Sequence, residues 1–537
     1  MKNKPYSSFV SPKVTNIPVS QSIPGKQMVT NSDGAFVFAT GHWKQLDRFL
    51  ILGACAPTYY ASREKLVLDN AAAIDACIAE NGQKVVKRVV EVSLAGRAPK
   101  NDPALFTLAL CTSKGNAETK KAAYAAIPQV ARTGTHILHF TNYVDDLRGW
   151  GRGMKRAVAN WFNGKSPASL AMQVVKYRQR DGWSMRDVLR TVHAKAKSDT
   201  HNAIFHYITK GWEEVGDQPH PDAALRVIWA VERAKNATSA KEVAKLVSEY
   251  GLPWEAIDTK WLNDHDVWDA LLLSIKPEAL MRNLGRLTSN GFLAPLSSQV
   301  KTVVGKLTDQ QSLIDNRLHP LKLLVALKTY EQGHGEKGKL AWTPAPAITQ
   351  ALEDAYYLAF DAVEPSNKRT LLALDLSGSM TWSNVAGMPI TPRVASAALA
   401  MVNARVEPEH YFVGFSSGIS PLNITPKQNL QSVINYIEQQ YASGTDCSLP
   451  FVWAKEHKIP VDTFVVITDN ETNGGIHPSL AMQKYKQAMG IDSKLVVVGM
   501  TSTGFTIADP NDSSMLDVVG FDTATPQIIS DFSSGNI

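Results

Sequence analysis

The hydrophobic pattern of this chain changes character near residue 360. Before that point, from about residue 45, apolar residues recur at helical spacing. Val67, Ala71 and Ile74, for instance, lie four and three positions apart and share one face of a helix. Comparable runs follow one another, joined by short segments that contain Gly, Asn, Asp or Pro. The pattern predicts antiparallel helix pairs stacked into an α-solenoid, with degenerate repeats because no fixed sequence period is visible.

Beyond residue 360, apolar runs of strand length alternate with helical runs. Strands are predicted at 371–376, 410–415, 463–468 and 494–500, and helices at 392–405, 429–440, 448–458 and 478–489. This alternation is typical of a doubly wound α/β sheet with mostly parallel strands. The expected organisation is a flexible tail over 1–30, an α-helical repeat domain over 31–360 and an α/β domain over 361–537.

Length and composition agree with two intracellular domains. A chain of 537 residues is too long for one hydrophobic core. No apolar run reaches the ~18 residues of a membrane-spanning helix, and the first 30 residues lack the apolar segment of a secretory signal. The cysteines are scattered without a Cys-x-x-Cys pair, at Cys55, Cys77, Cys111 and Cys447. This spacing argues against a zinc site or a structural disulfide and favours a reducing, cytoplasmic location.

The net charge of +6 conceals two domains of opposite sign. Residues 361–537 contain 10 Lys and Arg against 17 Asp and Glu, a formal charge of −7, which leaves +13 for residues 1–360. A strongly basic domain favours a polyanionic partner, chiefly nucleic acid. The alternative is a basic surface without a specific partner, which charge alone does not exclude.

Three separate loops of the predicted α/β domain carry oxygen ligands. The run Leu-Leu-Ala-Leu-Asp-Leu-Ser-Gly-Ser at 371–379 is a strand that ends in Asp375 and continues to Ser377 and Ser379. Further ligands are expected at Thr445, after a glycine turn, and at Asp469, at the end of another strand. Parallel strands bring such residues to one edge of the sheet, and hard oxygen ligands suit Mg²⁺. In the alternative interpretation the serines cap the next helix and the aspartates lie in turns.

An Asp-x-Ser-x-Ser motif, a distal Thr and a distal strand-end Asp, in that order, resemble the metal-ion-dependent adhesion site of von Willebrand factor A domains. The resemblance covers residues 361–537. It implies Mg²⁺, or another divalent cation, held directly or through water, with an open coordination position. A carboxylate of a partner protein would fill that position.

The densest basic chemistry of the predicted helical domain runs from Gly149 to Lys197. Lys176 and Arg180 are four positions apart and are expected on one face of a helix that ends at Asp181-Gly182. The next helix carries Arg190 and His193, three positions apart. Such side chains neutralise phosphates and can contact or stack on unpaired bases, so single-stranded RNA is a candidate ligand. The alternative is a solvated helix face.

The order of motifs along nearly the whole chain resembles the Ro 60 kDa family, which combines a TROVE domain with a von Willebrand factor A domain. The matching segments include Leu46-Asp47-Arg48-Phe49-Leu50, Lys176-Tyr177-Arg178-Gln179-Arg180-Asp181-Gly182-Trp183-Ser184, Tyr207-Ile208-Thr209-Lys210-Gly211-Trp212 and Gly444-Thr445-Asp446-Cys447-Ser448-Leu449-Pro450. The resemblance implies a closed ring of HEAT-like helical repeats. Residues 196–202 and the N-terminal tail depart from the family pattern.

The resemblance also implies RNA partners and RNA-contacting residues. The outer basic surface of the ring would bind small noncoding Y RNA, and its central hole would take single-stranded 3′ ends of misfolded RNAs. Such a protein serves RNA quality control and stress survival, and bacterial members act with the exoribonuclease polynucleotide phosphorylase. By motif position, RNA contacts fall on Lys176, Gln179, Arg180 and His193; Arg178 and Arg190 are added on location only.

The preferred interpretation is a monomeric RNA-binding scaffold without catalysis. A metal-assisted hydrolase or nuclease would need a second metal or a general base beside the ion, for which Asp446 and Glu471 are the nearest candidates. A hydroxyl-rich, single-ion site favours ligand capture over hydrolysis. A protein-adhesion module with no RNA role is the third interpretation, and the +13 charge of residues 1–360 argues against it.

Overall fold

The structure is a computed structural model, and most of the chain is described by it. The backbone of residues 63–69 is described without their side chains, and Cys55 and the side chain of Val67 lie outside the described part. The described ranges are 14–53, 63–147, 149–212, 216, 218–316, 318–335, 339–360, 363–382, 384–385, 389–440, 443–501, 503–522 and 524–536. Cys77, Cys111 and Cys447 are buried free thiols.

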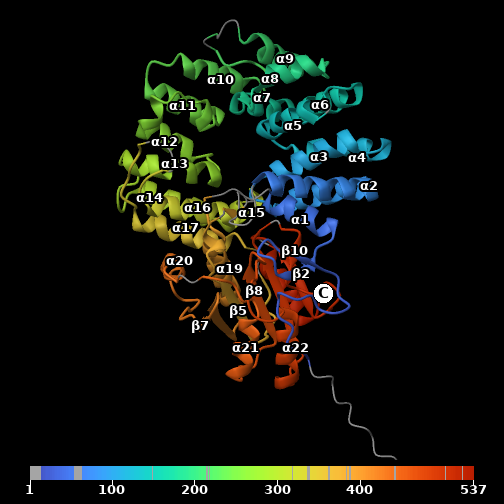
Figure 1. Ribbon diagram of the computed structural model, residues 1–537. Helices are drawn as coiled ribbons and strands as arrows, with labels where there is room; N and C mark the ends of the chain where they lie inside the picture. Colours follow the sequence, from blue (N-terminus) through green and yellow to red (C-terminus); the bar gives the residue numbers. More distant parts are fainter. Residues whose placement is uncertain are drawn as a thin grey trace, which may run out of the picture.

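The basic region forms a curved array of helices. In Figure 1 the array rises through α1–α9 on one side, returns through α10–α17 on the other, and has both ends next to the α/β domain. The elements are α1 (His42–Leu52), α2 (Arg63–Ala95), α3 (Asp102–Lys114), α4 (Ala117–Val130), α5 (Gly134–Leu147), α6 (Arg152–Gly164), α7 (Pro167–Lys176), α8 (Met185–Val192), α9 (Asp199–Lys210), α10 (Arg226–Lys235), α11 (Ala240–Tyr250), the 3₁₀ helices η1 (Trp254–Ala256) and η2 (Trp261–Asn263), α12 (His265–Leu272), α13 (Pro277–Ser289), α14 (Ser298–Leu307), α15 (Gln310–Asp315), α16 (Pro320–Glu331) and α17 (Pro346–Leu358).

Local sequence signals explain where these helices begin and pack. Ser166 accepts a hydrogen bond from the backbone of Ser169, and Pro167 occupies the first turn of α7. Within α2 the backbone leaves the helical region at Asn81, so the Asn81-Gly82 pair, which is expected to form a turn between two helices, forms a kink instead. Gly82 follows it because a Cβ there would lie 2.3 Å from Thr119 Oγ1 of α4. The predicted helical array is confirmed.

The C-terminal region is the predicted α/β domain. Its sheet has the order β11-β9-β8-β5-β6-β7, and neighbouring strands are parallel except for β6 and β7. The central strands are entirely buried, as expected for a parallel sheet covered on both faces. Its elements are β5 (Thr370–Asp375), α18 (Ser379–Trp382), α19 (Pro392–Val406), β6 (His410–Phe415), β7 (Ile419–Pro421), α20 (Leu430–Glu438), α21 (Leu449–Glu456), β8 (Thr463–Thr468), α22 (Pro478–Met489), β9 (Lys494–Gly499), β10 (Phe505–Thr506), β11 (Met515–Val519) and α23 (Thr525–Ser534).

Residues 14–30 differ from the expected flexible tail. β1 (Met28–Thr30) pairs with β2 (Phe36–Ala39), and β2 pairs with β10 of the α/β domain. Upstream of these strands, the backbone N–H of Val19 donates to Gly475 O at 3.1 Å, and Val19 is buried. The segment before the helical array is therefore part of the surface of the α/β domain.

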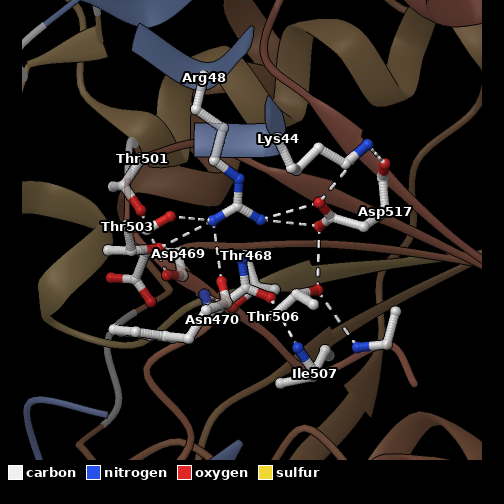
Figure 2. Close-up of polar contacts among 12 residues, drawn as sticks. Lys44, Arg48, Thr468, Asp469, Asn470, Thr501, Thr503, Thr506, Ile507 and Asp517 are labelled. Atoms are coloured by element: carbon white, nitrogen blue, oxygen red, sulfur yellow. Dashed lines mark hydrogen bonds and ion pairs between the residues drawn. The ribbon is translucent and has the colours of Figure 1, made fainter. Parts of the chain in front are cut away.

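One buried guanidinium joins the first helix to the α/β domain. Arg48 of α1 has no exposed side-chain surface, and its Nη2 donates to both carboxylate oxygens of Asp517 at 2.9 Å (Figure 2). Its Nη1 donates to Phe505 O at 2.8 Å and to the backbone oxygen of Thr503. A buried charge is tolerated when paired and hydrogen-bonded, and Arg48 meets both conditions.

The two ends of the helical array meet beside this junction. The side chain of His319, at the start of α16, contacts Arg97 O through Nε2 at 3.1 Å and accepts from the backbone of Leu321 through Nδ1. Arg97, just after α2, pairs with Asp522 at 2.9 Å. The array thus closes on itself against the segment that follows β11. Burial lowers the pKa of His319 to about 3.

The helices of the described part of the chain were compared with the requirements for spanning a membrane. None of these helices combines the length and the apolarity that crossing a bilayer requires.

Removing the Arg48 guanidinium should destabilise the domain junction strongly. In Arg48→Met, Asp517 and two backbone carbonyls lose a buried partner, so we expect a loss of about 3–5 kcal/mol in the free energy of unfolding by urea. The matched control is Arg88→Met on α2, whose partner Asp47 is also acidic but whose side chain is 31% exposed. That variant should lose under about 1 kcal/mol. Equal losses would contradict the assigned role of Arg48.

His319 should make stability fall on mild acidification. The unfolded side chain binds a proton at a pKa of about 6.5, whereas the folded one stays neutral down to about pH 3. The contribution is absent above pH 6.5 and destabilises by about 2 kcal/mol at pH 5. His319→Asn, which keeps a helix-capping acceptor, should be less stable at pH 7.5 but show a slope shallower by up to about one proton toward pH 5. An unchanged slope in urea denaturation between pH 7.5 and 5 would contradict the prediction.

Candidate metal site and basic surface

The predicted metal ligands converge at the carboxyl edge of the central sheet. Asp375 is the last residue of β5, and Asp469 follows β8, its parallel neighbour. Ser377 and Ser379 lie on the turn into α18. These four side chains and Thr445 are all buried. The strand register therefore brings together residues that are far apart in sequence, as expected from the positions of Asp375 and Asp469 at the ends of two strands.

Hydrogen bonds fix the orientation of the first three residues. Asp375 Oδ1 accepts from the backbone N–H of Ser377 at 2.9 Å, and its Oδ2 accepts from Thr468 Oγ1 at 2.6 Å. The hydroxyls of Ser377 and Ser379 lie 2.9 Å apart. Thr468 was not among the predicted site residues, although its position at the end of β8 beside Asp469 was a visible signal.

Thr445 lies on the adjacent loop and is positioned by its backbone. Its N–H donates to Asn473 Oδ1 at 2.8 Å, and its carbonyl accepts from the N–H of Asn473 at 2.8 Å. The loop lies close to the carboxylates. Burial, reinforced by the charges of Asp375 and Asp469, raises the pKa of Cys447 well above its usual value. No hydrogen bond within the described residues joins the Thr445 hydroxyl to the other four ligands.

Three buried carboxyl groups make this site strongly electronegative. Burial raises the pKa of Asp375, and burial together with the charge of Asp375 raises the pKa of Asp469 to about 7. Burial and Asp469 raise the pKa of Glu471 to about 8. Such a set of oxygen ligands fits a hard divalent cation, which would relieve the repulsion between the carboxylates.

The residues nominated for hydrolysis have structural partners. Asp446 Oδ1 accepts from the backbone N–H of Ser448 at 2.9 Å, and Glu471 Oε2 accepts from the N–H of Ser32 at 3.1 Å. The described part of the chain contains no cluster of three or more His, Cys, Asp or Glu side chains that could hold a metal ion. A cation at the sheet edge would thus depend on two carboxylates and the neighbouring hydroxyls.

The basic segment folds differently from the prediction. Helix α7 ends at Lys176, and residues 179–184 form a hairpin of β3 (Gln179–Arg180) and β4 (Trp183–Ser184). The predicted helical face shared by Lys176 and Arg180 is therefore wrong. Asp181 and Gly182 do not end a helix: both have positive φ, 51° and 78°, and form the two-residue turn of the hairpin.

The hairpin is anchored to α5 and followed by α8. The ring of His139 on α5 contacts the carboxylate of Asp181, and the N–H of Met185 donates to Arg178 O at 3.1 Å. Ser184 and Asp187 form a reciprocal capping box at the start of α8. Trp183 packs against Trp150 with ring centroids 5.8 Å apart, so this tryptophan has a packing role.

The cations of this region fall into two groups. Arg178, Arg180 and Arg190 are exposed, and none of them forms an ion pair with another described residue. Gln179 and His193 are exposed as well, and His193 caps α8 in the left-handed conformation with φ of 51°. Lys176 differs, because its Nζ lies 3.3 Å from Glu255 Oε1 of η1. The predicted RNA contacts thus combine free side chains with one that is already paired.

A groove next to α8 brings Arg190 together with basic residues that were not predicted to contact RNA. It has a volume of about 690 Å³ and is lined in part by Arg190, Lys195, Lys197 and His206. The side chain of Asn163 holds its loop through the backbone of Lys195 and of Lys197, at 2.9 and 3.2 Å. The alternation of Ala and Lys at 194–197 was the available signal.

Comparison with known proteins agrees with both halves of this arrangement. Residues 29–329 match the TROVE domain, and residues 369–533 match the Ro60 vWA domain. The chain belongs to the Ro60 family. The family resemblance and the fold class predicted from the motifs are thereby confirmed.

Two relatives match this chain over nearly its whole length. The chain is 41% identical to "RNA-binding protein RO60" of Deinococcus radiodurans, over 97% of this chain and 98% of the relative. It is 34% identical to "RNA-binding protein RO60" of Caenorhabditis elegans, over 95% and 90%. The crystal structure of the Deinococcus radiodurans RO (RSR) protein matches with a TM-score of 0.69 at 41% identity, covering 93% of this chain and 100% of that one.

Proposed function

We propose that this Ro60-family protein is an RNA-binding scaffold without catalytic activity. The observation that carries the proposal is the exposed basic surface of the hairpin and α8, where Arg178, Arg180 and Arg190 form no ion pair with another described residue. Relatives of the same domain organisation bear the name RNA-binding protein RO60, which supports the same function here. Unpaired guanidinium groups are suited to phosphate oxygens, which they bind in a bidentate manner.

The proposed RNA ligands are small noncoding Y-type RNA and single-stranded 3′ ends of misfolded RNAs. Arg180 and Lys176 would neutralise phosphates, while Gln179 and His193 offer groups that can bond base edges. Arg178 and Arg190 would add phosphate contacts. A scaffold of this kind would hand RNA to an exoribonuclease such as polynucleotide phosphorylase, acting as a monomer in the cytoplasm, where the buried free thiols of the described cysteines would persist.

We further propose Mg²⁺, or another divalent cation, at the edge of the sheet. Asp375, Ser377, Ser379 and Asp469 would hold it directly or through water, with Thr445 completing the set. The bound cation would supply an acceptor site for the carboxylate of a partner protein. The −7 charge of residues 361–537 disfavours RNA at this site, so capture of a protein ligand is the better-supported role.

RNA binding should depend on a single-stranded end and on the hairpin cations. We expect a stem with a single-stranded 3′ tail to bind at least about tenfold more tightly than the blunt stem at ~0.1 M salt. Arg178→Ala/Arg180→Ala should remove most of this difference and make the salt dependence shallower by about 0.7 per lost phosphate contact. Fluorescence anisotropy titrations at several salt concentrations measure both quantities.

The control for generic charge is Lys87→Ala/Lys301→Ala, which removes two exposed cations from α2 and α14. It should keep the preference for the tailed RNA. If wild type bound tailed and blunt stems equally, a role in capturing single-stranded ends would be excluded.

The metal proposal predicts a cation-dependent gain in stability. A ligand that binds only the folded state adds about 2.7 kcal/mol at a concentration one hundred times its Kd. Mg²⁺ should therefore raise the melting temperature of wild type in a way that EDTA reverses. Asp375→Ala should abolish the shift, and Asp492→Ala, which removes a 93% exposed carboxylate of the same domain, should retain it. A shift that survives Asp375→Ala would contradict the assigned site.

A further inference from the structure

Lys176 stands apart from the other basic residues of the candidate RNA surface because it already has an acidic partner. Its Nζ lies 3.3 Å from Glu255 Oε1, and both side chains are only about a quarter exposed, at 23% and 25%. The ammonium also lies over the ring of Tyr177, 5.5 Å from the centroid. Lys176 is therefore fixed between a ring and a carboxylate.

The ion pair connects elements from distant parts of the helical array. Lys176 ends α7, whereas Glu255 belongs to η1, the 3₁₀ turn that joins α11 to α12, and α7 and η1 are in contact. A second carboxylate lies nearby. Burial chiefly raises the pKa of Tyr177, and the charges of Glu255 and Glu278 add to the rise. The negative charges of both Glu255 and Glu278 therefore act at Tyr177, the residue that follows α7.

These carboxylates differ in how strongly they are neutralised. Glu278 pairs with Arg282 on its own helix and with Lys322 at 3.3 Å, and its pKa is lowered by these cations although burial opposes them. Among the described residues, Glu255 has one ionic partner, which is Lys176. The two side chains of this pair therefore depend on each other for charge compensation.

We propose that Glu255 is an intramolecular competitor that occupies Lys176 in place of an RNA phosphate. The inference rests on the proposed RNA-binding function and concerns the same surface. Carboxylate and phosphate oxygens are the same class of acceptor for an ammonium group, and both are anionic. An RNA that engages Lys176 must displace Glu255 and leave that carboxylate without its partner.

The competition makes the site selective. Arg178 and Arg180 are exposed and available at once, so they make the first phosphate contacts. An isolated phosphate gains too little from Lys176 to separate the ion pair. A single strand that already contacts the hairpin brings its next phosphate to Lys176 at high effective concentration and displaces Glu255. The pair thereby favours extended RNA over small anions.

The test compares Glu255→Gln, Lys176→Ala and the double variant with Glu91→Gln. The last removes the same charge from an ion-paired, 46% exposed glutamate on α2. Binding of a stem with a single-stranded 3′ tail is followed by anisotropy over a salt series, and melting temperatures verify folding. Inorganic phosphate, added as a competitor, measures the selectivity.

We expect Glu255→Gln to bind the tailed RNA about two- to fivefold more tightly than wild type, since a partly exposed ion pair stabilises by up to about 1 kcal/mol. The salt dependence should not become shallower than in wild type, because Lys176 contacts the same phosphate and no carboxylate is released. Inorganic phosphate should compete better than in wild type. In the Lys176→Ala background, Glu255→Gln should do no more than Glu91→Gln does.

Two results would overturn the inference. Equal gains in RNA affinity from Glu255→Gln and Glu91→Gln would mean that only the overall electrostatic potential of the protein matters. A gain from Glu255→Gln that persists without Lys176 would mean that the carboxylate acts on other groups. Both results leave RNA binding intact, whereas the absence of tail-dependent binding in wild type would refute the proposed function and this inference together.

Discussion

The arrangement of this molecule depends on a guanidinium that has been removed from water. The Arg48 side chain extends from the first helix of the array into the α/β domain. Its bonds to Asp517 and to the carbonyls of residues 503 and 505 join the two parts (Figure 2). A buried cation is strongly position-specific, because any other docking of α1 would leave both the guanidinium and Asp517 uncompensated. The apolar surface around the junction supplies the attraction, and Arg48 selects one orientation.

The segment that binds Arg48 also contacts the loop that carries Asp469, one of the candidate metal ligands. Asn470, which follows Asp469, accepts a hydrogen bond from Ile507 N at 3.1 Å, and Thr501 Oγ1 donates to Asp469 O at 3.2 Å. Thr501 and Ile507 flank the two residues whose backbone oxygens accept from Arg48, Thr503 and Phe505. On the opposite side, the N–H of Ser32, just before β2, donates to Glu471. The loop after β8 is thus held by segments that also hold the start of the helical array.

Much of this fold could be predicted from the sequence because burial leaves a recognisable pattern of apolar residues in each helix and strand. The four predicted strands agree with β5, β6, β8 and β9 to within about one residue, since strands buried on both faces read as continuous apolar runs. Short elements escaped detection. β1, β2 and β10 have two to four residues each, and β2 pairs with β10 across more than 400 positions, a constraint that no local pattern records.

The two candidate sites also differ in how far local sequence predicts them. The convergence of the candidate metal ligands was predictable because strand ends in a parallel sheet meet at one edge, whatever the intervening sequence. The basic surface was not, because Asp181-Gly182 can end a helix or turn a hairpin. Asp-Gly is the residue pair that a two-residue turn with two positive φ angles requires, and it favoured the hairpin. Charge counting was also insufficient. A total of +13 for residues 1–360 does not distinguish Arg180, which is free to bind an anion, from Lys176, which already holds one. Only the fold, by bringing η1 to the end of α7, determines which cations remain available.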